Sequence, residues 1–537
     1  METARIPSFL ILILLPLMST VYSDNILVIP RPGYSHVRPV KVMVDILIEE
    51  YQHNVTMLLT ESVAKHLALK DLRGEIVTYD KDGKVRQRMD EMRTKAYRTG
   101  FENIGFISLS PYIQKMDEEI TYSLMTDSEI LKTLEERKYR TVMVDGMGSL
   151  PFLMLAHNLS IPEIIHFSAF ISPKFRYRAP SDYSGIPEFP MFPLSDTTSF
   201  LSRLKNFGIH LGFIAVGSFL ESFHYSKDIV HRYISTPRLD EFYKLANGFS
   251  LYLLDQDEIL DYPRPVLPNI VPVGGLALSN IVHPLPIEIE RHVNTAKDGV
   301  VIATFGCSFE NVPDEFKSKL YQAFKNIPEI HFILKIDETY FQNKNILQTP
   351  WLPQNDLLGN KKIKAFITHC GNSGQYEALY HGVPMVAIPI FGDQVYNADR
   401  IVMKSFGVKL DLVAFTSGDL EKSIREVVYN DTYSRKIKLA SEMYRSKPQN
   451  ASQRAAYWVH HVTTYGSVHL RSPSHSLPAY KYLALDVVRA FHLSVESPIV
   501  IVLFIIIIII IIIFLPSKKI FVLRLIEKLY SPSYSTS

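Results

Sequence analysis

The chain has 537 residues and a formal net charge of +2, from 57 Lys and Arg against 55 Asp and Glu. This length exceeds what one hydrophobic core organises, so we expect two domains with additional segments. The balanced charge gives no reason to expect nucleic acid as a partner. With only two cysteines, Cys307 and Cys370, a disulfide framework is excluded, and we expect two buried free thiols.

The amino terminus has the pattern of a secretory signal peptide, residues 1–23. Arg5 precedes an apolar core from Phe9 to Leu17, and cleavage is expected after Ser23. The alternative, an uncleaved anchor, needs a longer apolar stretch than this one.

Residues 24–262 are expected to form a first α/β domain. His36 and Asp145 each follow a predicted strand, at the edge where α/β sheets bind ligands. From the sequence alone, a His at a strand end is more often a solvated loop residue. The elements expected are strands at 25–30, 54–59, 141–144 and 161–165, a loop at 31–36, a helix at 40–48, and charged helices from about 80 to 135.

Residues 172–250 are rich in aromatic residues and prolines, and we expect them to line an apolar acceptor pocket and touch the membrane surface. The triplet Asp255-Gln256-Asp257 has the letters of a metal-binding Asp-x-Asp motif, but we interpret it as a surface loop. No other His or Cys spacing suggests a metal site.

A Pro- and Gly-containing linker from Tyr262 to Gly275 leads into a second α/β domain, residues 263–470. Its last helix is expected to cross back to the first domain. The elements expected are strands at 299–304 and 330–335, a helix from about 314, and helices at 417–430, 431–445 and 451–464.

The stretch from Trp351 to Gln394 carries the densest pattern. Ala365–Thr368 predicts a buried strand, a polar turn follows, a helix begins at Gln375 and stops at Gly382, and a second strand spans Met385–Ile390. This β-α-β unit implies parallel strands with a right-handed crossover.

The turn after this strand is suited to binding phosphate, because it aims backbone N–H groups and the positive end of a helix dipole outward. The small residues at 371–374, which include Gly371, Ser373 and Gly374, allow a pyrophosphate to approach. His369 can add a donor or a positive charge.

The same stretch offers groups for a nucleoside and a sugar. Trp351 offers a ring on which a base can stack. Glu377 can accept from two vicinal hydroxyls, and Asp393 and Gln394 can bind further hydroxyls. Together these residues predict a nucleotide-sugar site. Taken singly, Trp351 is as readily a core residue, Glu377 a solvated helix residue and Asp393 a helix cap.

The ordered string from Trp351 to Gln394 resembles the signature of the UDP-glycosyltransferases, most closely the animal UDP-glucuronosyltransferases. The resemblance implies a GT-B type fold of two facing Rossmann-like domains. It assigns uracil to Trp351, the nucleoside to Gln354 and the ribose to Glu377. It further assigns the phosphates to His369 and Ser373, and the donor sugar to Asp393 and Gln394.

The resemblance also assigns His36, in a Ser-His pair, as the base that activates the acceptor hydroxyl, supported by Asp145. A carboxylate behind an imidazole fixes its tautomer and raises its basicity. The family inverts anomeric configuration, and no cofactor or metal is implied, since the UDP-sugar is a co-substrate. The chain departs from the family at Cys370, usually Gly, at Cys307, often Ser, and at Val37, often Trp.

Near the carboxyl terminus, residues 499–515 form an uninterrupted apolar run between Pro498 and Pro516, which predicts a transmembrane helix after a juxtamembrane segment, residues 471–498. The tail, residues 516–537, begins with Lys518 and Lys519 and is expected to be cytoplasmic. The bulk is then lumenal, a type I topology. Four N-glycosylation sequons agree with this: Asn54, Asn158, Asn430 and Asn450.

We therefore expect a membrane-anchored transferase that moves glucuronate or glucose from a UDP-sugar to a small lipophilic acceptor. Galactose and N-acetylglucosamine remain open as donor sugars. The alternatives are a non-catalytic UDP-sugar-binding subunit of a transferase complex and, more distantly, a nucleotide-sugar hydrolase. Retention in the endoplasmic reticulum follows only from the resemblance, and a homo-oligomer remains possible.

Overall fold

The computed structural model divides into two compact units, residues 1–472 and 473–537. The second unit contains two described helices, α19 (Ala479–Tyr482) and α20 (Leu485–Val495). The structure describes residues 23–66, 73–101, 109–146, 150–169, 199–209, 248–306, 312–336, 341–473, 477, 479–482 and 484–495.

The first sheet of the unit has seven parallel strands in the order β3-β2-β1-β4-β5-β6-β7. Its central strands are apolar and buried on both faces, as expected where helices cover both sides of a parallel sheet. The strands are β1 (Asn25–Ile29), β2 (Asn54–Thr60), β3 (Glu75–Tyr79), β4 (Thr141–Asp145), β5 (Glu163–Ser168), β6 (Leu251–Leu254) and β7 (Ile270–Pro272).

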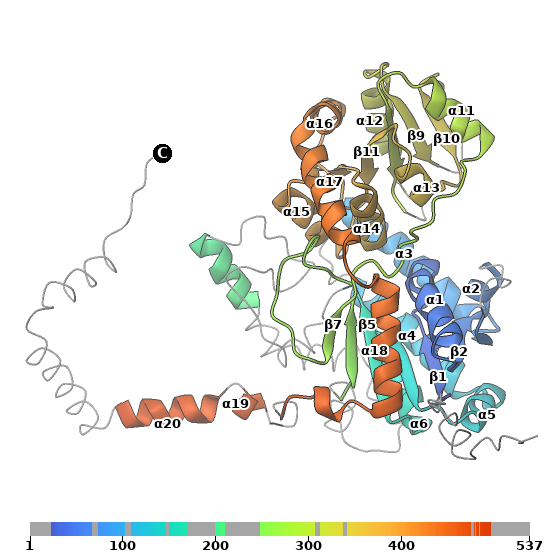
Figure 1. The fold of residues 1–537 in the computed structure, drawn as a ribbon, viewed down its shortest axis with the longest axis vertical. Helices are drawn as coiled ribbons and strands as arrows, with labels where there is room; N and C mark the ends of the chain where they lie inside the picture. The colour runs from blue at the N-terminus through green and yellow to red at the C-terminus, as the bar shows by residue number, and fades with distance from the viewer. Residues whose placement is uncertain are drawn as a thin grey trace, which may run out of the picture. The chain divides into compact units, whose positions relative to one another are not determined.

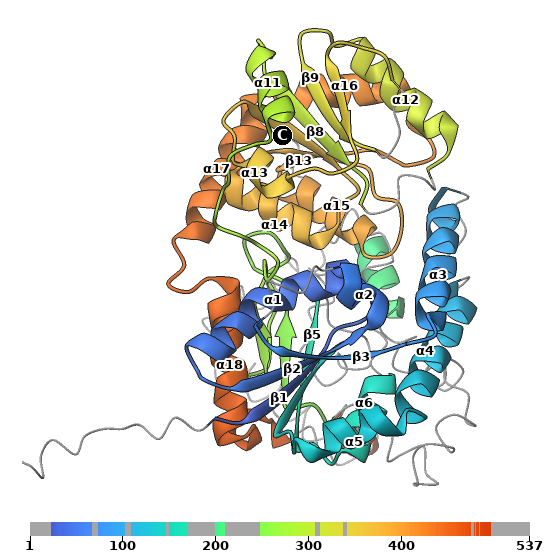
Figure 2. The ribbon, with the colours of Figure 1, turned by 90° about the vertical axis from the view of Figure 1, so that its right-hand side faces the viewer.

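The helices around this sheet include the charged helical region expected between 80 and 135 (Figure 2). The strand β7 lies within the segment expected to be a linker, and it pairs with β6. The first sheet therefore extends beyond the boundary expected at Tyr262. The helices are α1 (Tyr34–Glu49), α2 (Glu61–His66), α3 (Lys84–Phe101), α4 (Ser110–Met125), α5 (Ser128–Glu136) and α6 (Leu150–Asn158).

The second sheet has six parallel strands in the order β10-β9-β8-β11-β12-β13. Its strands are β8 (Val300–Thr304), β9 (His331–Lys335), β10 (Ile346–Thr349), β11 (Ile363–Thr368), β12 (Met385–Ala387) and β13 (Gly407–Lys409). The helices are α11 (Ile287–Thr295), α12 (Asp314–Lys325), α13 (Gln354–Leu358), α14 (Asn372–His381), α15 (Gln394–Met403), α16 (Ser417–Tyr429) and α17 (Asp431–Arg445).

The predicted β-α-β unit of the signature stretch is confirmed as β11, α14 and β12. The helix begins at Asn372, three residues earlier than expected, and ends with Gly382 in the left-handed conformation at φ 69°. Glycine is favoured there because it has no Cβ to clash with the preceding turn. The second strand ends at Ala387 rather than at Ile390.

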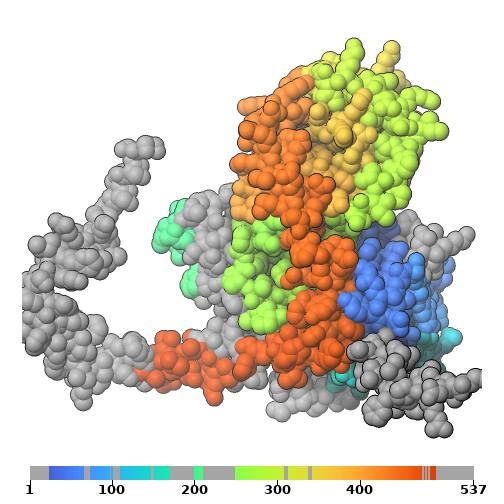
Figure 3. Space-filling model, viewed as in Figure 1, coloured from blue at the N-terminus to red at the C-terminus, as the bar shows by residue number. Residues whose placement is uncertain are grey.

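The last helix of the unit, α18 (Ala451–Tyr465), lies against the first sheet and α1, as predicted (Figures 1 and 3). Asn450 and Gln453 form a capping box at its start, which satisfies two backbone N–H groups of the first turn. Its Ala455, Val459 and Val462 are buried in the same core as β1 and α1.

Two histidines join α18 to the start of β2. The backbone N–H of Asp24 donates to Nδ1 of His53 at 3.3 Å, so Nε2 of His53 carries a proton and donates to Nδ1 of His460 at 2.9 Å. The ring of His460 stacks on Tyr51 with centroids 4.3 Å apart. Burial lowers the pKa of both His53 and His460 below the usual 6.5, and both contacts require neutral rings.

We expect this pair to make stability depend on pH. Because the folded-state pKa values are lowered, the stabilisation is complete above pH 6.5 and is lost as pH falls below it. His460→Gln should lower the free energy of unfolding by about 1 kcal/mol at pH 7.5, by loss of the hydrogen bond and ring contact. The difference from wild type should shrink toward pH 5 in urea titrations. The exposed His157→Gln serves as control; a constant difference across pH would contradict the assignment.

Candidate active site

His36 lies in the first turn of α1, because that helix begins at Tyr34 and not at residue 40. The prediction that His36 belongs to a loop is therefore wrong. Pro39, a residue that usually marks the beginning of a helix, lies inside α1 instead. The consequence is that the backbone of His36 is held by the helix, which fixes the direction of its side chain.

The side chains of His36 and Asp145 are in direct contact. Nδ1 of His36 lies 2.6 Å from Oδ2 of Asp145, the last residue of β4. Asp145 is 4% exposed and His36 is 33% exposed. A carboxylate in this position keeps the proton on Nδ1, so Nε2 is the nitrogen that can accept a proton from a hydroxyl.

Asp393 and Gln394 begin α15, in the second half of the molecule. Burial raises the pKa of Asp393, against the opposing effects of Asn397, Arg400 and His36. Oδ2 of Asp393 accepts from Asn397 at 2.8 Å, and the residue occupies the N-cap position without a side-chain cap bond. Oε1 of Gln394 accepts the N–H groups of residues 390 and 391, which leaves its amide N–H groups to donate to a sugar.

The turn between β11 and α14 approaches other groups closely. A Cβ on Gly371 would lie 2.9 Å from Nε2 of His369, and a Cβ on Gly374 would lie 3.1 Å from Nε2 of Gln354, so a larger residue at either position would displace one of these side chains. Ser373 lies in the first turn of α14. Cys370 is buried and has φ 69°, a left-handed conformation that glycine adopts with less strain than a residue with a Cβ.

Burial, together with the charge of Lys335, lowers the pKa of His369 to about 4, against a hydrogen bond with the backbone of Thr304. Of the two expected contributions of His369, a donor or a positive charge, this pKa favours the neutral hydrogen-bond donor, and its role at the phosphates stays a prediction. Its Nδ1 has no hydrogen-bond partner among the described residues.

Lys335 provides a positive charge near the turn between β11 and α14, and the sequence analysis missed it. Lys335 ends β9, next to β8 in the sheet, and its Nζ donates to the carbonyl of Gly306 at 3.1 Å. The signal available in the sequence was a lysine at the end of an apolar strand of the second domain. Its position beside the phosphate turn makes Lys335 a candidate to bind an anion.

Trp351 is 63% exposed and Glu377 is fully buried, so neither of the simple structural interpretations holds for these two residues. Oε1 of Glu377 accepts from Nη2 of Arg38 at 2.5 Å. Its other oxygen accepts from Nε2 of Gln354, the first residue of α13. The sequence analysis did not identify Arg38 as a residue of this site.

Arg400 is fully buried at the centre of a hydrogen-bond network. Its guanidinium donates to Oδ2 of Asp261 at 2.7 Å, to Gln375 at 2.8 Å and to Asn372 at 2.7 Å. Asn372 and Gln375 lie in the first turn of α14, so the network fixes the phosphate turn to the segment after β6.

The interpretation of residues 255–257 as a surface loop is wrong, because all three are buried. Asp255 accepts the N–H groups of Gly275 and Leu276 and the amide of Asn372. Burial raises the pKa of Asp255 to about 6, against these hydrogen bonds. Within the described ranges, no cluster of three His, Cys, Asp or Glu side chains could hold a metal ion.

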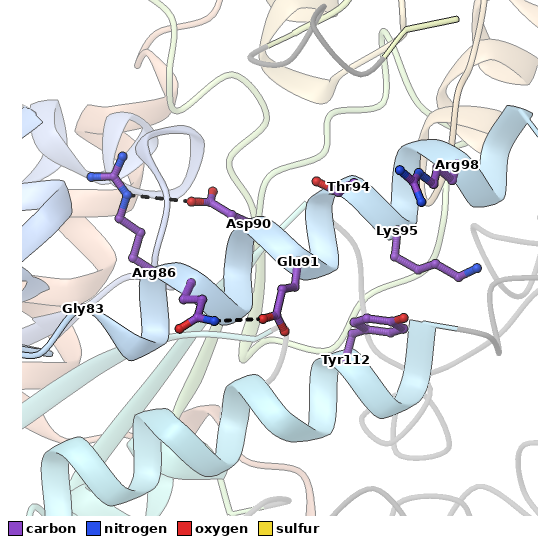
Figure 4. Close-up of a pocket in the computed structure, with 9 residues that line it drawn as sticks. Gly83, Arg86, Asp90, Glu91, Thr94, Lys95, Arg98 and Tyr112 are labelled. Atoms are coloured by element: carbon purple, nitrogen blue, oxygen red, sulfur yellow. Dashed lines mark hydrogen bonds and ion pairs between the residues drawn. The ribbon is translucent and has the colours of Figure 1, made fainter.

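A separate hollow of about 690 Å³ lies between α3 and α4 (Figure 4). Its lining carries both signs of charge, and Arg86 pairs with Asp90 at 3.8 Å. None of the predicted site residues lines it. Its lining residues are Gly83, Arg86, Gln87, Asp90, Glu91, Thr94, Lys95, Arg98 and Tyr112.

All four sequon asparagines are exposed. In the part of the chain that the structure describes, no helix is both long and apolar enough to cross a bilayer. The predicted span 499–515, residues 1–22 of the signal peptide and Cys307 lie outside the described residues.

Solved glycosyltransferases share this fold. The structure of Os79 from O. sativa in complex with U2F and trichothecene aligns with a TM-score of 0.58 and 14% identity, over 82% of this chain and 100% of Os79. Spinosyn forosaminyltransferase SpnP aligns with a TM-score of 0.55 and 14% identity, over 82% and 100%. The protein therefore has the GT-B glycosyltransferase fold, and the predicted fold class is confirmed.

The sequence matches the profile of the UDP-glucoronosyl and UDP-glucosyl transferases over residues 24–519. It is 32% identical to UDP-glucuronosyltransferase 1A6 of Mus musculus, over 91% of this chain and 92% of that protein. It is 30% identical to 2-hydroxyacylsphingosine 1-beta-galactosyltransferase of Mus musculus, over 86% and 84%. The chain belongs to this family and is a UDP-sugar-dependent glycosyltransferase.

The buried Arg400 network yields a stability prediction. Arg400→Leu removes the nearer of the two cations of buried Asp261, at 2.7 Å, and leaves Arg264 at 3.6 Å, so the free energy of unfolding should fall by about 3–5 kcal/mol. Arg425→Leu removes a surface pair with Glu329, where the arginine is 38% exposed, and should cost about 0–1 kcal/mol. Denaturant titrations of both variants test this, and losses of equal size would contradict it.

Proposed function

We propose that the protein transfers a hexosyl group from a UDP-sugar to the hydroxyl of a small lipophilic acceptor with inversion of anomeric configuration. The observation that carries this proposal is the 2.6 Å contact between His36 and Asp145. His36 is also close enough to Asp393 for its charge to oppose the rise in the pKa of that carboxyl that burial causes. A His-Asp pair of this geometry is suited to take a proton from a neutral hydroxyl.

In the proposed reaction, Nε2 of His36 takes the acceptor proton while the acceptor oxygen forms a bond to the anomeric carbon. The bond from that carbon to the phosphate oxygen breaks, and UDP leaves with the electron pair. The free N–H groups of the first turn of α14 and the charge of Lys335 stabilise the leaving diphosphate. Asp145 stabilises the imidazolium that forms.

The donor is proposed to bind with uracil on Trp351, ribose at Glu377 and Gln354, the phosphates at His369, Gly371, Ser373 and Gly374, and the sugar at Asp393 and Gln394. The exposure of Trp351 and the amide N–H groups of Gln394 support this placement.

We propose glucuronate or glucose as the donor sugar. The relative named for glucuronosyl transfer supports glucuronate. The relative named for a sphingosine acceptor supports lipophilic acceptors and keeps galactose among the sugars to test. We also propose a type I membrane protein with its bulk in the lumen of the endoplasmic reticulum, for which the apolar run at 499–515 and the exposed sequons are the support.

The alternative, a non-catalytic UDP-sugar-binding subunit, does not account for the His36–Asp145 contact. A nucleotide-sugar hydrolase would use the same pair to activate water, so the acceptor dependence of UDP release separates hydrolase from transferase.

UDP release by the full-length protein in detergent, with a panel of UDP-sugars and mixed phenols, tests the proposal. Wild type should require an acceptor and prefer one donor. His36→Ala should lower kcat by about 10²–10⁴-fold, because the general base is lost, with little change in donor KM. Asp145→Asn should lower kcat in the same direction.

The exposed His157→Gln should behave as wild type. Release without acceptor would establish the hydrolase. Donor binding without turnover in the wild type would favour the non-catalytic subunit.

A further inference from the structure

The nucleoside site proposed at Trp351, Gln354 and Glu377 contains a contact that the proposed function does not use. Glu377 would accept the vicinal hydroxyls of the donor ribose, but in the structure both of its oxygens are already bound. One partner, Gln354, comes from the same half of the molecule. The other, Arg38, comes from α1, two residues after His36.

The contact between Arg38 and Glu377 is strong and also displaceable. The distance of 2.5 Å from Nη2 to Oε1 and the fully buried carboxylate describe a charge-assisted hydrogen bond in a low dielectric. The Arg38 side chain is 37% exposed. It can therefore swing out without rearranging the core, whereas Glu377 is fixed within α14.

Binding of a ribose requires Glu377 to change partners. Each oxygen of Glu377 accepts one hydrogen bond and the side chain has no exposed surface, so a ribose can reach the carboxylate only if one of these partners moves away. The stacking surface of Trp351 remains open at 63% exposure. In the structure, the surface on which uracil would stack is accessible, whereas the carboxylate that would bind the ribose is not.

We propose that Arg38 is a gating residue of the nucleoside site, which competes with the donor ribose for Glu377. This proposal rests on the proposed function, since it takes Glu377 as the ribose acceptor. Arg38 thereby opposes donor binding, and its ion pair with Glu377 joins α1 to α14. When the ribose binds Glu377, the guanidinium of Arg38 is released. Arg38 remains on α1, the helix that also carries His36.

The test measures the dissociation constant of uridine, which has a ribose and no phosphate that could attract the freed arginine. Arg38→Leu in the full-length protein should bind uridine about tenfold more tightly than wild type, because the ribose no longer has to displace the charge-assisted hydrogen bond between Arg38 and Glu377. Arg38→Gln, which keeps a neutral donor, should give a smaller gain and guards against a misfolded leucine variant.

Arg425→Leu is the matched control, because Arg425 has a similar exposure of 38% and its ion pair with Glu329 involves no residue of the proposed nucleoside site. It should leave uridine binding unchanged. A weakened or unchanged affinity in both Arg38 variants would overturn the proposal and show that Arg38 supports Glu377 in the bound state.

Two further measurements separate this proposal from the proposed function. Binding of 2′,3′-dideoxyuridine should not respond to Arg38→Leu, and an equal gain for this ligand would overturn the competition. Glu377→Gln should weaken uridine binding. If Glu377→Gln leaves uridine binding unchanged, Glu377 does not bind the ribose and that part of the proposed function is refuted. If Glu377→Gln and Arg38→Leu both weaken uridine binding, Glu377 binds the ribose and only the competition by Arg38 is refuted.

Discussion

The parallel alignment of the strands is the constraint on which the site depends. When strands are parallel, every strand ends at the same edge of its sheet, so residues far apart in sequence meet there. Ile29 pairs with Val144 across β1 and β4, and this register places the turn after β1 beside Asp145. The His36–Asp145 contact is a direct consequence. In the second sheet, the same rule brings together the ends of β8, β9 and β11.

Buried charges hold these edges in place. Arg400 is fully enclosed, pairs with Asp261 and donates to Asn372 and Gln375, so the first turn of α14 cannot shift without breaking hydrogen bonds to a buried, paired guanidinium. Such a pair adds little net stability compared with apolar packing, but the loss of one partner is costly. This asymmetry favours a fixed geometry at the turn that would bind a diphosphate.

The sequence predicted the fold class and most strands, because fully buried parallel strands appear as continuous apolar runs. The signature stretch also predicted where α14 ends, since Gly382 is a strong stop signal. The start of α1 was missed because Pro39 usually lies at a helix start. β7 was missed because a three-residue strand beside prolines resembles a linker.

The missed contributions to the site have a different cause. Arg38 and Lys335 have no motif of their own, and their importance comes from the segments that fold against them. Asp255 likewise accepts from Asn372, more than a hundred residues later in the chain, a contact that no local pattern reports. The lowered pKa of His369 follows from burial, which no local pattern reports. The roles assigned to these residues remain predictions.

The central claim is that His36 activates an acceptor hydroxyl for direct displacement of UDP. The anomeric configuration of the product, determined by NMR from an α-configured UDP-sugar, tests it most directly. The account predicts a β-linked product, because attack opposite to the leaving UDP inverts the anomeric carbon. An α-linked product would require a double displacement or attack on the same face, and it would contradict the account.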